Sequence, residues 1–193
     1  MNPIRSVAVF CGAQAGDSPV FRAAAETLGT GLAKAGIRLI FGGGRIGLMG
    51  TLADAVIAGG GEVLGVIPEF LTQLEVAHAG VSRLIVTESM HARKQSMYEL
   101  ADAFVSMPGG LGTLDETIEI ITWRQLSLHD KPIILCDVAD SAAPLLAAID
   151  AAITRGFAHP SARRLFHVTH DPIEALELLT QLPPGRGLDA TRL

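Results

Sequence analysis

The residues of this chain best suited to chemistry lie in one short stretch, MPGGLGTLDE, which runs from Met107 to Glu116. It follows an apolar run at residues 103–107 that is typical of a buried strand, and it leads into apolar residues at helical spacing. A glycine-rich turn between a strand and a helix leaves backbone N–H groups at the positive end of the helix, where they favour an anion. Asp115 and Glu116 follow in what we expect to be the first helical turn. The stretch therefore predicts a phosphate site beside an acid.

Each of these residues also has a purely structural explanation. An acidic residue in a first helical turn stabilises the helix dipole, so Asp115 and Glu116 could serve the helix alone. Thr113 could cap the helix or donate to a phosphate, and its type does not separate the two roles. For the histidines His78, His91 and His129 we expect a role in stabilising turns rather than in chemistry.

A second glycine-rich stretch, GGGRIGLMG, runs from Gly42 to Gly50. Its glycine spacing departs from that of a dinucleotide-binding fingerprint, and the next strand ends in Ile67 and Pro68 rather than in an acid for a ribose. No lysine follows Thr113 as it would in a Walker A loop. The stretch fits a turn at which backbone approaches a ligand closely, with tight packing as the alternative.

A basic residue interrupts the apolar face of the helix predicted at about residues 90–101. Met90, Met97 and Leu100 form the apolar stripe of this helix, and Arg93 falls within it. An inward guanidinium is costly unless an anion meets it. Arg93 could instead extend to the surface or pair with a structural carboxylate, and this helix by itself favours such a structural role.

Strands and helices alternate along the chain, which predicts an α/β fold with a doubly wound parallel sheet and helices on both faces. We expect a single domain over residues 1–182 and a flexible tail over residues 183–193, which are rich in proline and glycine. The segment 69–80 is predicted to be a loop. After the glycine-rich motif, a helix is predicted with one face at the spacing of Leu114, Ile118, Ile121, Gln125 and Leu128. Ligands of such sheets bind at the carboxyl ends of the strands. The predicted strands are 6–11, 37–41, 62–67, 82–87, 103–107, 133–136 and 166–169.

Composition narrows the classes of function. The chain has 193 residues, 49% of them hydrophobic, and a formal net charge of −5, which argues against nucleic acid or an anionic membrane as its main partner. No apolar run is long enough to span a bilayer. Cys11 and Cys136 lie in strand-like runs and are expected to be buried thiols in a reducing compartment. The histidines do not cluster, so we expect a cytoplasmic protein without a metal site.

Three motifs together carry a family resemblance. Residues 42–50, the sequence MHARK at residues 90–94, and PGGLGTLDE at residues 108–116 resemble those of the LOG-type cytokinin riboside 5′-monophosphate phosphoribohydrolases. Members of this family are often mislabelled lysine decarboxylases. The likeness also covers residues 10–12 and 121–132 and so extends over nearly the whole chain.

The resemblance implies a Rossmann-like homodimer that needs no cofactor. Its members hydrolyse the N-glycosidic bond of adenosine-type nucleoside 5′-monophosphates and release the free base and ribose 5-phosphate. The implied catalytic pair is Arg93 and Glu116. The implied substrate contacts are Glu75, Arg93, Lys94, Gly110, Leu111, Gly112, Thr113, Leu114, Asp115, Glu116 and Thr122. Further candidate contacts to phosphate or base are Gly12, Gly43, Gly44 and Met90.

This chemistry agrees with the residue types. Breaking a glycosidic bond creates oxocarbenium character on the ribose, which a carboxylate stabilises. Glu116 would either stabilise that charge or activate water, while Arg93 holds the substrate and the carboxylate. Two positions depart from the family pattern: Ala13 replaces a common serine, and Leu111 replaces a residue that is often aromatic in plant members.

Other classes of function remain to be weighed. A nucleotide-sensing or carrier module would use the same glycine turns without turnover, and a paired arginine and glutamate would argue against it. For a dinucleotide-dependent oxidoreductase, this sequence lacks the acidic residue that would bind the ribose. A lysine decarboxylase needs a lysine Schiff base with pyridoxal phosphate, and among Lys34, Lys94 and Lys131 only Lys94 falls near the predicted site.

Overall fold

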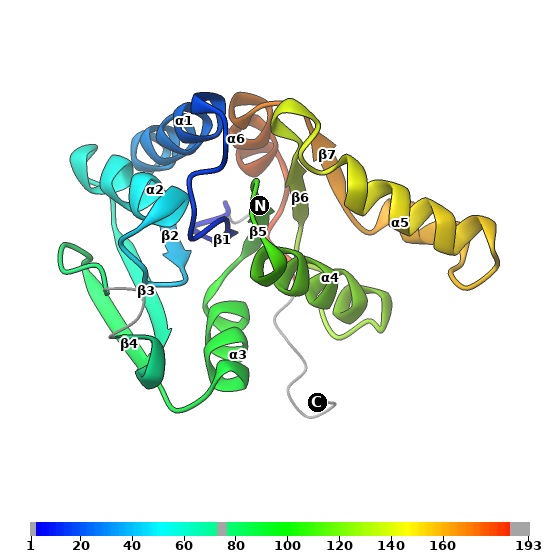
Figure 1. Ribbon diagram of the computed structural model, residues 1–193, viewed down its shortest axis with the longest axis horizontal. Helices are drawn as coiled ribbons and strands as arrows, with labels where there is room; N and C mark the ends of the chain where they lie inside the picture. Colours follow the sequence, from blue (N-terminus) through cyan, green and yellow to red (C-terminus); the bar gives the residue numbers. More distant parts are fainter. Residues whose placement is uncertain (1–2, 73–76, 186–193) are drawn as a thin grey trace.

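The computed structural model describes residues 3–72 and 77–185. Within these residues, seven parallel strands form one sheet in the order β4-β3-β2-β1-β5-β6-β7 (Figure 1). All seven predicted strands are confirmed, with ends within one residue of those expected. The strands are β1 (Ser6–Phe10), β2 (Arg38–Phe41), β3 (Val63–Pro68), β4 (Arg83–Thr87), β5 (Ala103–Ser106), β6 (Ile133–Cys136) and β7 (His167–Thr169).

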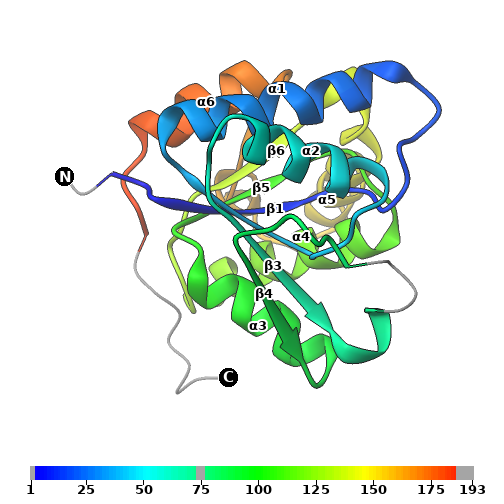
Figure 2. The same cartoon turned by 90° about the vertical axis from the view of Figure 1, so that its left-hand side faces the viewer.

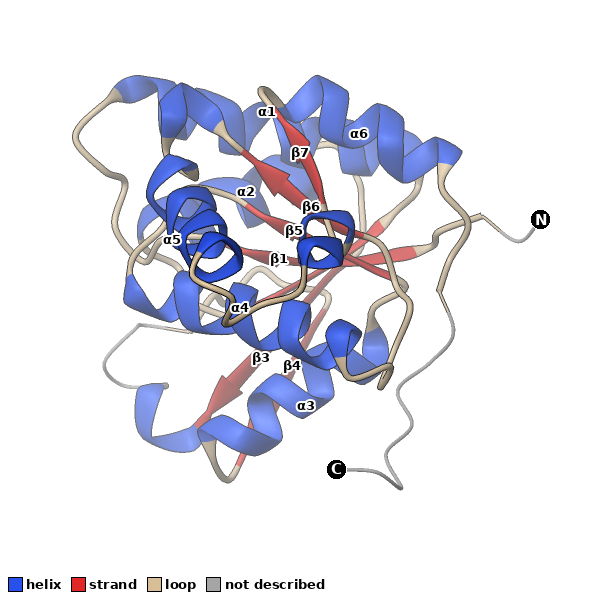
Figure 3. Ribbon diagram, turned by 90° about the vertical axis from the view of Figure 1, so that its right-hand side faces the viewer, coloured by secondary structure: helices blue, strands red, loops and turns tan. Residues whose placement is uncertain are grey.

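Helices cover both faces of the sheet, as the alternating pattern predicts. Helices α1, α2 and α6 pack on one face, and α3, α4 and α5 lie on the other (Figures 2 and 3). Each layer encloses its own apolar cluster against the strands, so the sheet is buried on both sides. The helices are α1 (Pro19–Ala35), α2 (Gly47–Ala58), α3 (Met90–Leu100), α4 (Leu111–Gln125), α5 (Ala143–Thr154) and α6 (Pro172–Gln181).

The ends of α1 follow local rules. The Ser18 side chain accepts a hydrogen bond from Val20 N, Pro19 occupies the first helical position, and Gly36 closes the helix with a left-handed φ of 66°. The segment after β3 departs from the prediction, because residues Glu69–Leu71 form a turn of 3-10 helix within the expected loop. The predicted tail lies for the most part outside the described residues.

The start of α4 corrects an expectation. The helix begins at Leu111 with Gly110 as its cap, so Asp115 and Glu116 lie in the second turn rather than the first. Thr113 lies inside the first turn and does not cap the helix, since no side chain does so. The extended backbone of Gly110 lets the helix begin directly after the glycine pair.

Two predicted apolar faces are also partly wrong. Leu114 and Ile118 are 38% and 50% exposed, whereas Ile121 is buried as predicted. On α3, Met97 is buried, but Met90 and Leu100 are each 37% exposed. The side chain that fills the core from α3 is Tyr98, which is fully buried. Helical spacing alone does not show how wide a face the neighbouring elements cover.

The strand order reverses between β1 and β5, which are neighbours in the middle of the sheet. From β1 the chain proceeds outward to β4, and from β5 it proceeds to the opposite edge at β7. The turns after these two strands meet, because Gly12 N donates to Pro108 O at 3.0 Å. A crevice outside the carboxyl ends of the strands at such a reversal is the usual ligand site of this architecture.

The glycine-rich stretch 42–50 packs against the turn after β1. Leu48 N and Met49 N, at the start of α2, both donate to Gly12 O, at 3.0 and 3.3 Å. Gly47 has a φ of +64°, and a Cβ added there would lie 2.3 Å from the carbonyl carbon of Ala13. The positive end of α2 is therefore occupied by backbone, and glycine at position 47 permits the close packing.

We predict that Gly47→Ala destabilises the protein far more than Gly36→Ala. Both glycines have left-handed φ values, but a Cβ at Gly36 would meet nothing within 4 Å. Backbone strain alone should cost about 1 kcal/mol at position 36, whereas strain and overlap with Ala13 should cost about 3 kcal/mol or more at position 47. Urea unfolding measures both values, and equal costs would contradict the packing role of Gly47.

Candidate active site

A cavity of about 550 Å³ lies at the carboxyl ends of β1 and β5, where the strand order reverses. Its walls come from the turn after β1, the ends of β1, β2 and β5, and the first turns of α2 and α4. Arg93 of α3 and Glu116 of α4 contribute the charged side chains of this lining. The cavity therefore combines a glycine-rich turn, an open helix start and an ion pair.

The start of α4 leaves backbone donors at the cavity wall. The helix's first hydrogen bond runs from Leu114 N to Gly110 O at 3.1 Å, so the N–H groups of residues 111–113 have no acceptor within the helix. Gly110 and Gly112 face open space, since a Cβ added at either would meet nothing within 4 Å. With the positive end of the helix dipole behind them, these N–H groups form an anion cradle.

Gly109 lets the cradle close against the turn after β1. A Cβ at this position would lie 2.1 Å from Thr113 Oγ1 and 2.9 Å from Gly12 N. Any side chain at position 109 would push the first turn of α4 away from its neighbours. The glycine pair thus has two different roles, close packing at Gly109 and open access at Gly110.

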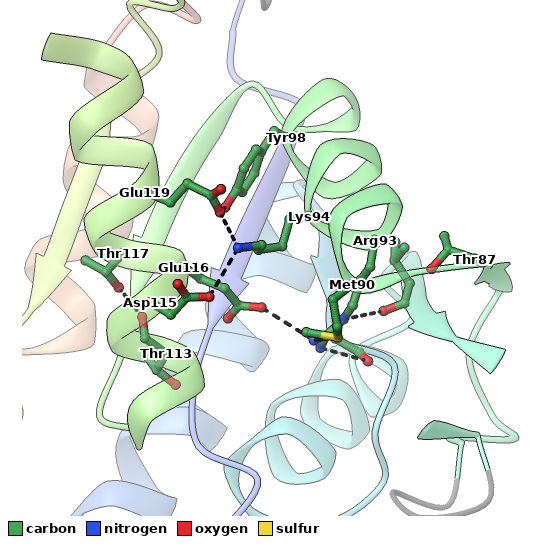
Figure 4. A network of polar contacts seen from close by, with 12 residues as sticks. Thr87, Met90, Arg93, Lys94, Tyr98, Thr113, Asp115, Glu116, Thr117 and Glu119 are labelled. Carbon is green, nitrogen blue, oxygen red and sulfur yellow. Dashed lines mark hydrogen bonds and ion pairs between the residues drawn. The ribbon is translucent and has the colours of Figure 1, made fainter. Parts of the chain in front are cut away.

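Arg93 and Glu116 form a buried pair beside the cradle. Arg93 Nη1 lies 3.6 Å from Glu116 Oε1, and the two side chains are only 8% and 11% exposed (Figure 4). The guanidinium also donates from Nε to Val66 O at 3.1 Å and from Nη2 to Gly42 O at 3.3 Å. Arg93 therefore does not extend to the surface, and the carboxylate that it meets lines a cavity.

Spacing along α4 explains which of its residues reach the cavity. Gly112, Thr113 and Glu116 are separated by intervals that place them on one helical face, and all three line the cavity. Asp115 lies on a neighbouring face, where its Oδ2 pairs with Lys94 Nζ at 3.2 Å. Thr122 donates from Oγ1 to Ile118 O of its own helix at 2.8 Å.

The predicted contacts therefore divide into two groups. Those that line the cavity are Gly12, Arg93, Gly110, Leu111, Gly112, Thr113 and Glu116. Those outside its lining are Gly43, Gly44, Met90, Lys94, Leu114, Asp115 and Thr122. Their roles as substrate contacts stay predictions, and Glu75 lies outside the described residues.

The cavity also contains residues that the sequence analysis did not select. The turn after β1 contributes Gln14, and α1 contributes Phe21. Ser141, which precedes α5, reaches the same cavity from the far side of β5. The position of a turn directly after β1 could have indicated Gln14, because ligands bind at such turns. Phe21 and Ser141 belong to no motif, and only the packing of α1 and of the segment before α5 brings them in.

The predicted buried thiols are confirmed, and so are the turn roles of His78 and His129, whereas His91 lies within α3 rather than in a turn. Cys11 and Cys136 are free and buried. Cys11 lines the cavity. Its burial, and to a smaller extent the negative charge of Glu116, raise the pKa of its thiol, so the thiol stays protonated. His78 Nδ1 accepts from Gly80 N, and His129 Nδ1 accepts from Lys131 N. Burial lowers the pKa of His129 to about 4, so its ring is neutral.

Two kinds of feature were not found among the described residues, a cluster of metal ligands and a membrane-spanning helix. Across residues 3–72 and 77–185, no group of three or more His, Cys, Asp or Glu side chains is arranged to hold a metal ion. In the same part of the chain, no helix is both long enough and apolar enough to cross a bilayer.

Comparison with known proteins identifies the family. The family described as "Possible lysine decarboxylase" matches residues 49–179. The cytokinin riboside 5′-monophosphate phosphoribohydrolase of Rhodococcoides fascians is 45% identical over 168 residues, which is 86% of this chain and 85% of that protein. This chain belongs to the LOG-type phosphoribohydrolase family. The Arabidopsis thaliana member LOG1 is 43% identical over 94% of this chain and 84% of its own length.

Solved structures share the fold of this LOG-type chain at lower identity. The molybdenum cofactor carrier protein of Chlamydomonas reinhardtii superposes with a TM-score of 0.69 at 23% identity, over 94% of this chain and 98% of that one. The DNA processing protein A of Streptococcus pneumoniae gives a TM-score of 0.57 at 12% identity, over 89% and 60% of the two chains. These similarities establish the Rossmann-like architecture and nothing about the ligand.

The lysines of this family member do not suit the decarboxylase description. Lys94 Nζ is held by Asp115 and Glu119, at 3.2 and 2.8 Å. Lys131 is buried and donates to Tyr98 O, and Lys34 lies in the last turn of α1. None of the three lines the cavity, so no lysine is placed there to form the Schiff base that such a reaction uses.

We predict that Gly42→Ala displaces Arg93, because the added Cβ would lie 2.1 Å from Arg93 Nη2. Loss of the buried guanidinium contacts should cost about 2 kcal/mol of unfolding free energy. In an Arg93→Ala background the same change should cost less than about 1 kcal/mol, because the overlap with the guanidinium is gone and only the looser contact with Met49 Sδ at 3.0 Å remains. Urea unfolding of the four proteins completes this cycle. Equal losses of unfolding free energy in the two backgrounds would show that Gly42 is not needed to make space for Arg93.

Proposed function

We propose that this protein hydrolyses the N-glycosidic bond of adenosine-type nucleoside 5′-monophosphates, including cytokinin nucleotides. The products are the free base and ribose 5-phosphate. Relatives at 39–45% identity carry the name of this activity. The observation that carries the proposal is the buried Arg93–Glu116 pair, which shares one cavity with the anion cradle at the start of α4.

The 5′-phosphate would bind at the cradle. The N–H groups of residues 111–113 point from the positive end of α4, and charge-assisted hydrogen bonds from such groups suit phosphate oxygens. The start of α2 offers no equivalent site, since Gly12 O already accepts from Leu48 N and Met49 N. The two glycine-rich stretches therefore differ in function, and only the one at the start of α4 is open to a phosphate.

A phosphate at the cradle would place the ribose over Glu116. This residue follows Leu111 by five positions, which is about 7.5 Å along the helix axis. A ribose 5-phosphate has comparable length, so its C1′ would come near the carboxylate. As the bond to the base breaks, positive charge develops on the ribose, and Glu116 would stabilise that charge or activate the attacking water.

Arg93 would hold Glu116 in position for this step. Its guanidinium is fixed by the carbonyls of Val66 and Gly42 and has its remaining edge toward Glu116 Oε1 at 3.6 Å. That separation is longer than a close charged hydrogen bond, which leaves room for the pair to tighten around a bound substrate. No cofactor is needed for the reaction as written.

A non-catalytic nucleotide-binding or sensing module is the second candidate. The anion cradle would serve it equally well. Burying a carboxylate beside a phosphate site, however, costs desolvation energy and repels an anionic ligand. A module that only binds nucleotides has no need of such a group, whereas a hydrolase does. The placement of Glu116 therefore favours hydrolysis.

We predict that Glu116→Gln abolishes turnover but preserves binding. The amide keeps the shape of the side chain and loses its charge, so kcat should fall by at least about 10²-fold. The dissociation constant for AMP should change by no more than about threefold, because the cradle is intact. Chromatography of AMP and N6-isopentenyl-AMP reactions measures the released base, and titration calorimetry measures binding. Glu177→Gln, at an exposed position of α6, is the matched control.

The result separates the two candidate functions. Free base released by the wild-type protein and lost in Glu116→Gln supports the hydrolase. Nucleotide binding with no base release by the wild-type protein would support the sensing module instead.

We also propose that the protein is a cytoplasmic homodimer, as the family resemblance implies. The free thiols Cys11 and Cys136 support a reducing compartment, and cell fractionation tests it. Leu114 and Ile118 leave an apolar stripe exposed on α4, which suits a subunit contact.

We predict that Ile118→Glu weakens the dimer, because it places a charge in this stripe. Light scattering on eluting protein should show dimeric wild type and a shift toward monomer for the variant. Ile173→Glu, at an exposed apolar position of α6, should leave the mass unchanged. A monomeric wild-type protein would contradict the proposed assembly.

A further inference from the structure

Beside the catalytic pair, a second polar cluster joins α3 to α4. Lys94 Nζ lies 2.8 Å from Glu119 Oε2 and 3.2 Å from Asp115 Oδ2, and Tyr98 Oη donates to Glu119 Oε2 at 2.7 Å. Figure 4 shows Lys94 and Tyr98 of α3 directed toward the carboxylates of α4. We call these four residues the α3–α4 latch.

The latch is anchored in the core through Tyr98. This ring is fully buried, and it makes edge contacts with Trp123 and Phe104 at centroid distances of 4.6 and 5.8 Å. Burial raises the pKa of Tyr98, and the hydrogen bond to Glu119 raises it further, so the hydroxyl remains a donor. The position of Glu119 is thus tied to a rigid part of the molecule.

Lys94 bridges the two helices as a cation. Burial lowers its pKa, but the hydrogen bonds and charges of Glu119 and Asp115 outweigh this effect and raise the pKa overall. Asp115 is 61% exposed and Glu119 only 23%, so water screens the contact with Asp115 more strongly. Glu119, which contacts both Lys94 and Tyr98, is the centre of the latch.

The latch lies next to the catalytic pair on both helices. Lys94 follows Arg93 on α3, and Glu119 follows Glu116 by about one turn on α4. The Arg93–Glu116 separation of 3.6 Å is too long for a strong charged hydrogen bond, whereas the contacts of Glu119 are 2.8 and 2.7 Å. The shorter contacts are those that hold the two helices at a fixed distance.

We propose that Glu119 is a positioning residue, which holds α3 and α4 at the separation that Arg93 and Glu116 need for catalysis. This inference rests on the proposed hydrolase function. Glu119 is absent from the cavity lining and acts through Lys94 and Tyr98 rather than on the substrate. The latch also explains why Lys94, although next to Arg93, is directed away from the anion cradle.

The test is steady-state hydrolysis of AMP by Glu119→Ala. Looser packing of α3 against α4 should lower kcat at least about fivefold, because small misplacements of catalytic groups are costly. KM should change less than about twofold. Glu119→Gln keeps an acceptor for Tyr98 and Lys94 and should restore part of kcat. Glu99→Ala is the matched control, since this exposed carboxylate accepts only from Gln95 within α3 in the contacts described and should leave kcat unchanged.

Other patterns would overturn the proposal. An unchanged kcat, or a rise in KM that equals or exceeds the fall in kcat, would show that Glu119 does not position the pair. A stability cycle on Tyr98→Phe and Glu119→Ala requires no turnover: the double variant should be destabilised less than the sum of the single variants, and additive costs would refute the latch. Absence of base release by the wild-type protein would instead contradict the proposed function, and with it the catalytic effect of Glu119.

Discussion

The site depends on one buried cation. A guanidinium removed from water is tolerated only when its donors and its charge have partners. Val66 O and Gly42 O accept hydrogen bonds from Arg93, and the Glu116 carboxylate, 3.6 Å from Nη1, balances its charge. These partners come from the ends of β3 and β2 and from α4. Two strand ends and two helices must therefore be correctly placed relative to one another before the charge can be buried. The missing Cβ of Gly42 gives the guanidinium the space that it needs.

The two glycine-rich stretches show how similar chemistry serves two purposes. Both lie between a strand and a helix, and both place N–H groups at a helix start. At α2 the carbonyl of Gly12 accepts those donors, so the stretch binds the turn after β1 and shapes one wall of the cavity. At α4 no side chain caps the helix, and Gly110 and Gly112 leave the approach open. Packing of one helix thus shapes the cavity at the start of the other.

The fold is shared with a molybdenum cofactor carrier protein and a DNA processing protein. In this chain the crevice that the architecture supplies at the reversal of strand order contains the charged pair of Arg93 and Glu116. The same reasoning applies to the decarboxylase description of the family. Its chemistry needs a lysine in the cavity, and the cavity lining contains an arginine and a glutamate instead.

The sequence by itself determined the order of strands and helices, the ends of α1, and the face of α4 that carries Gly112, Thr113 and Glu116. These features depend on neighbours along the chain and on the periods of helix and strand. The start of α4 at Leu111, the exposure of Ile118 and the arrival of Phe21 in the cavity were decided by the tertiary structure. So was the meeting of Arg93 with Gly42, 51 residues away, because such contacts follow from the order of strands in the sheet. The family resemblance implies the pair of Arg93 and Glu116, but only the tertiary structure brings the guanidinium of α3 to the carboxylate of α4.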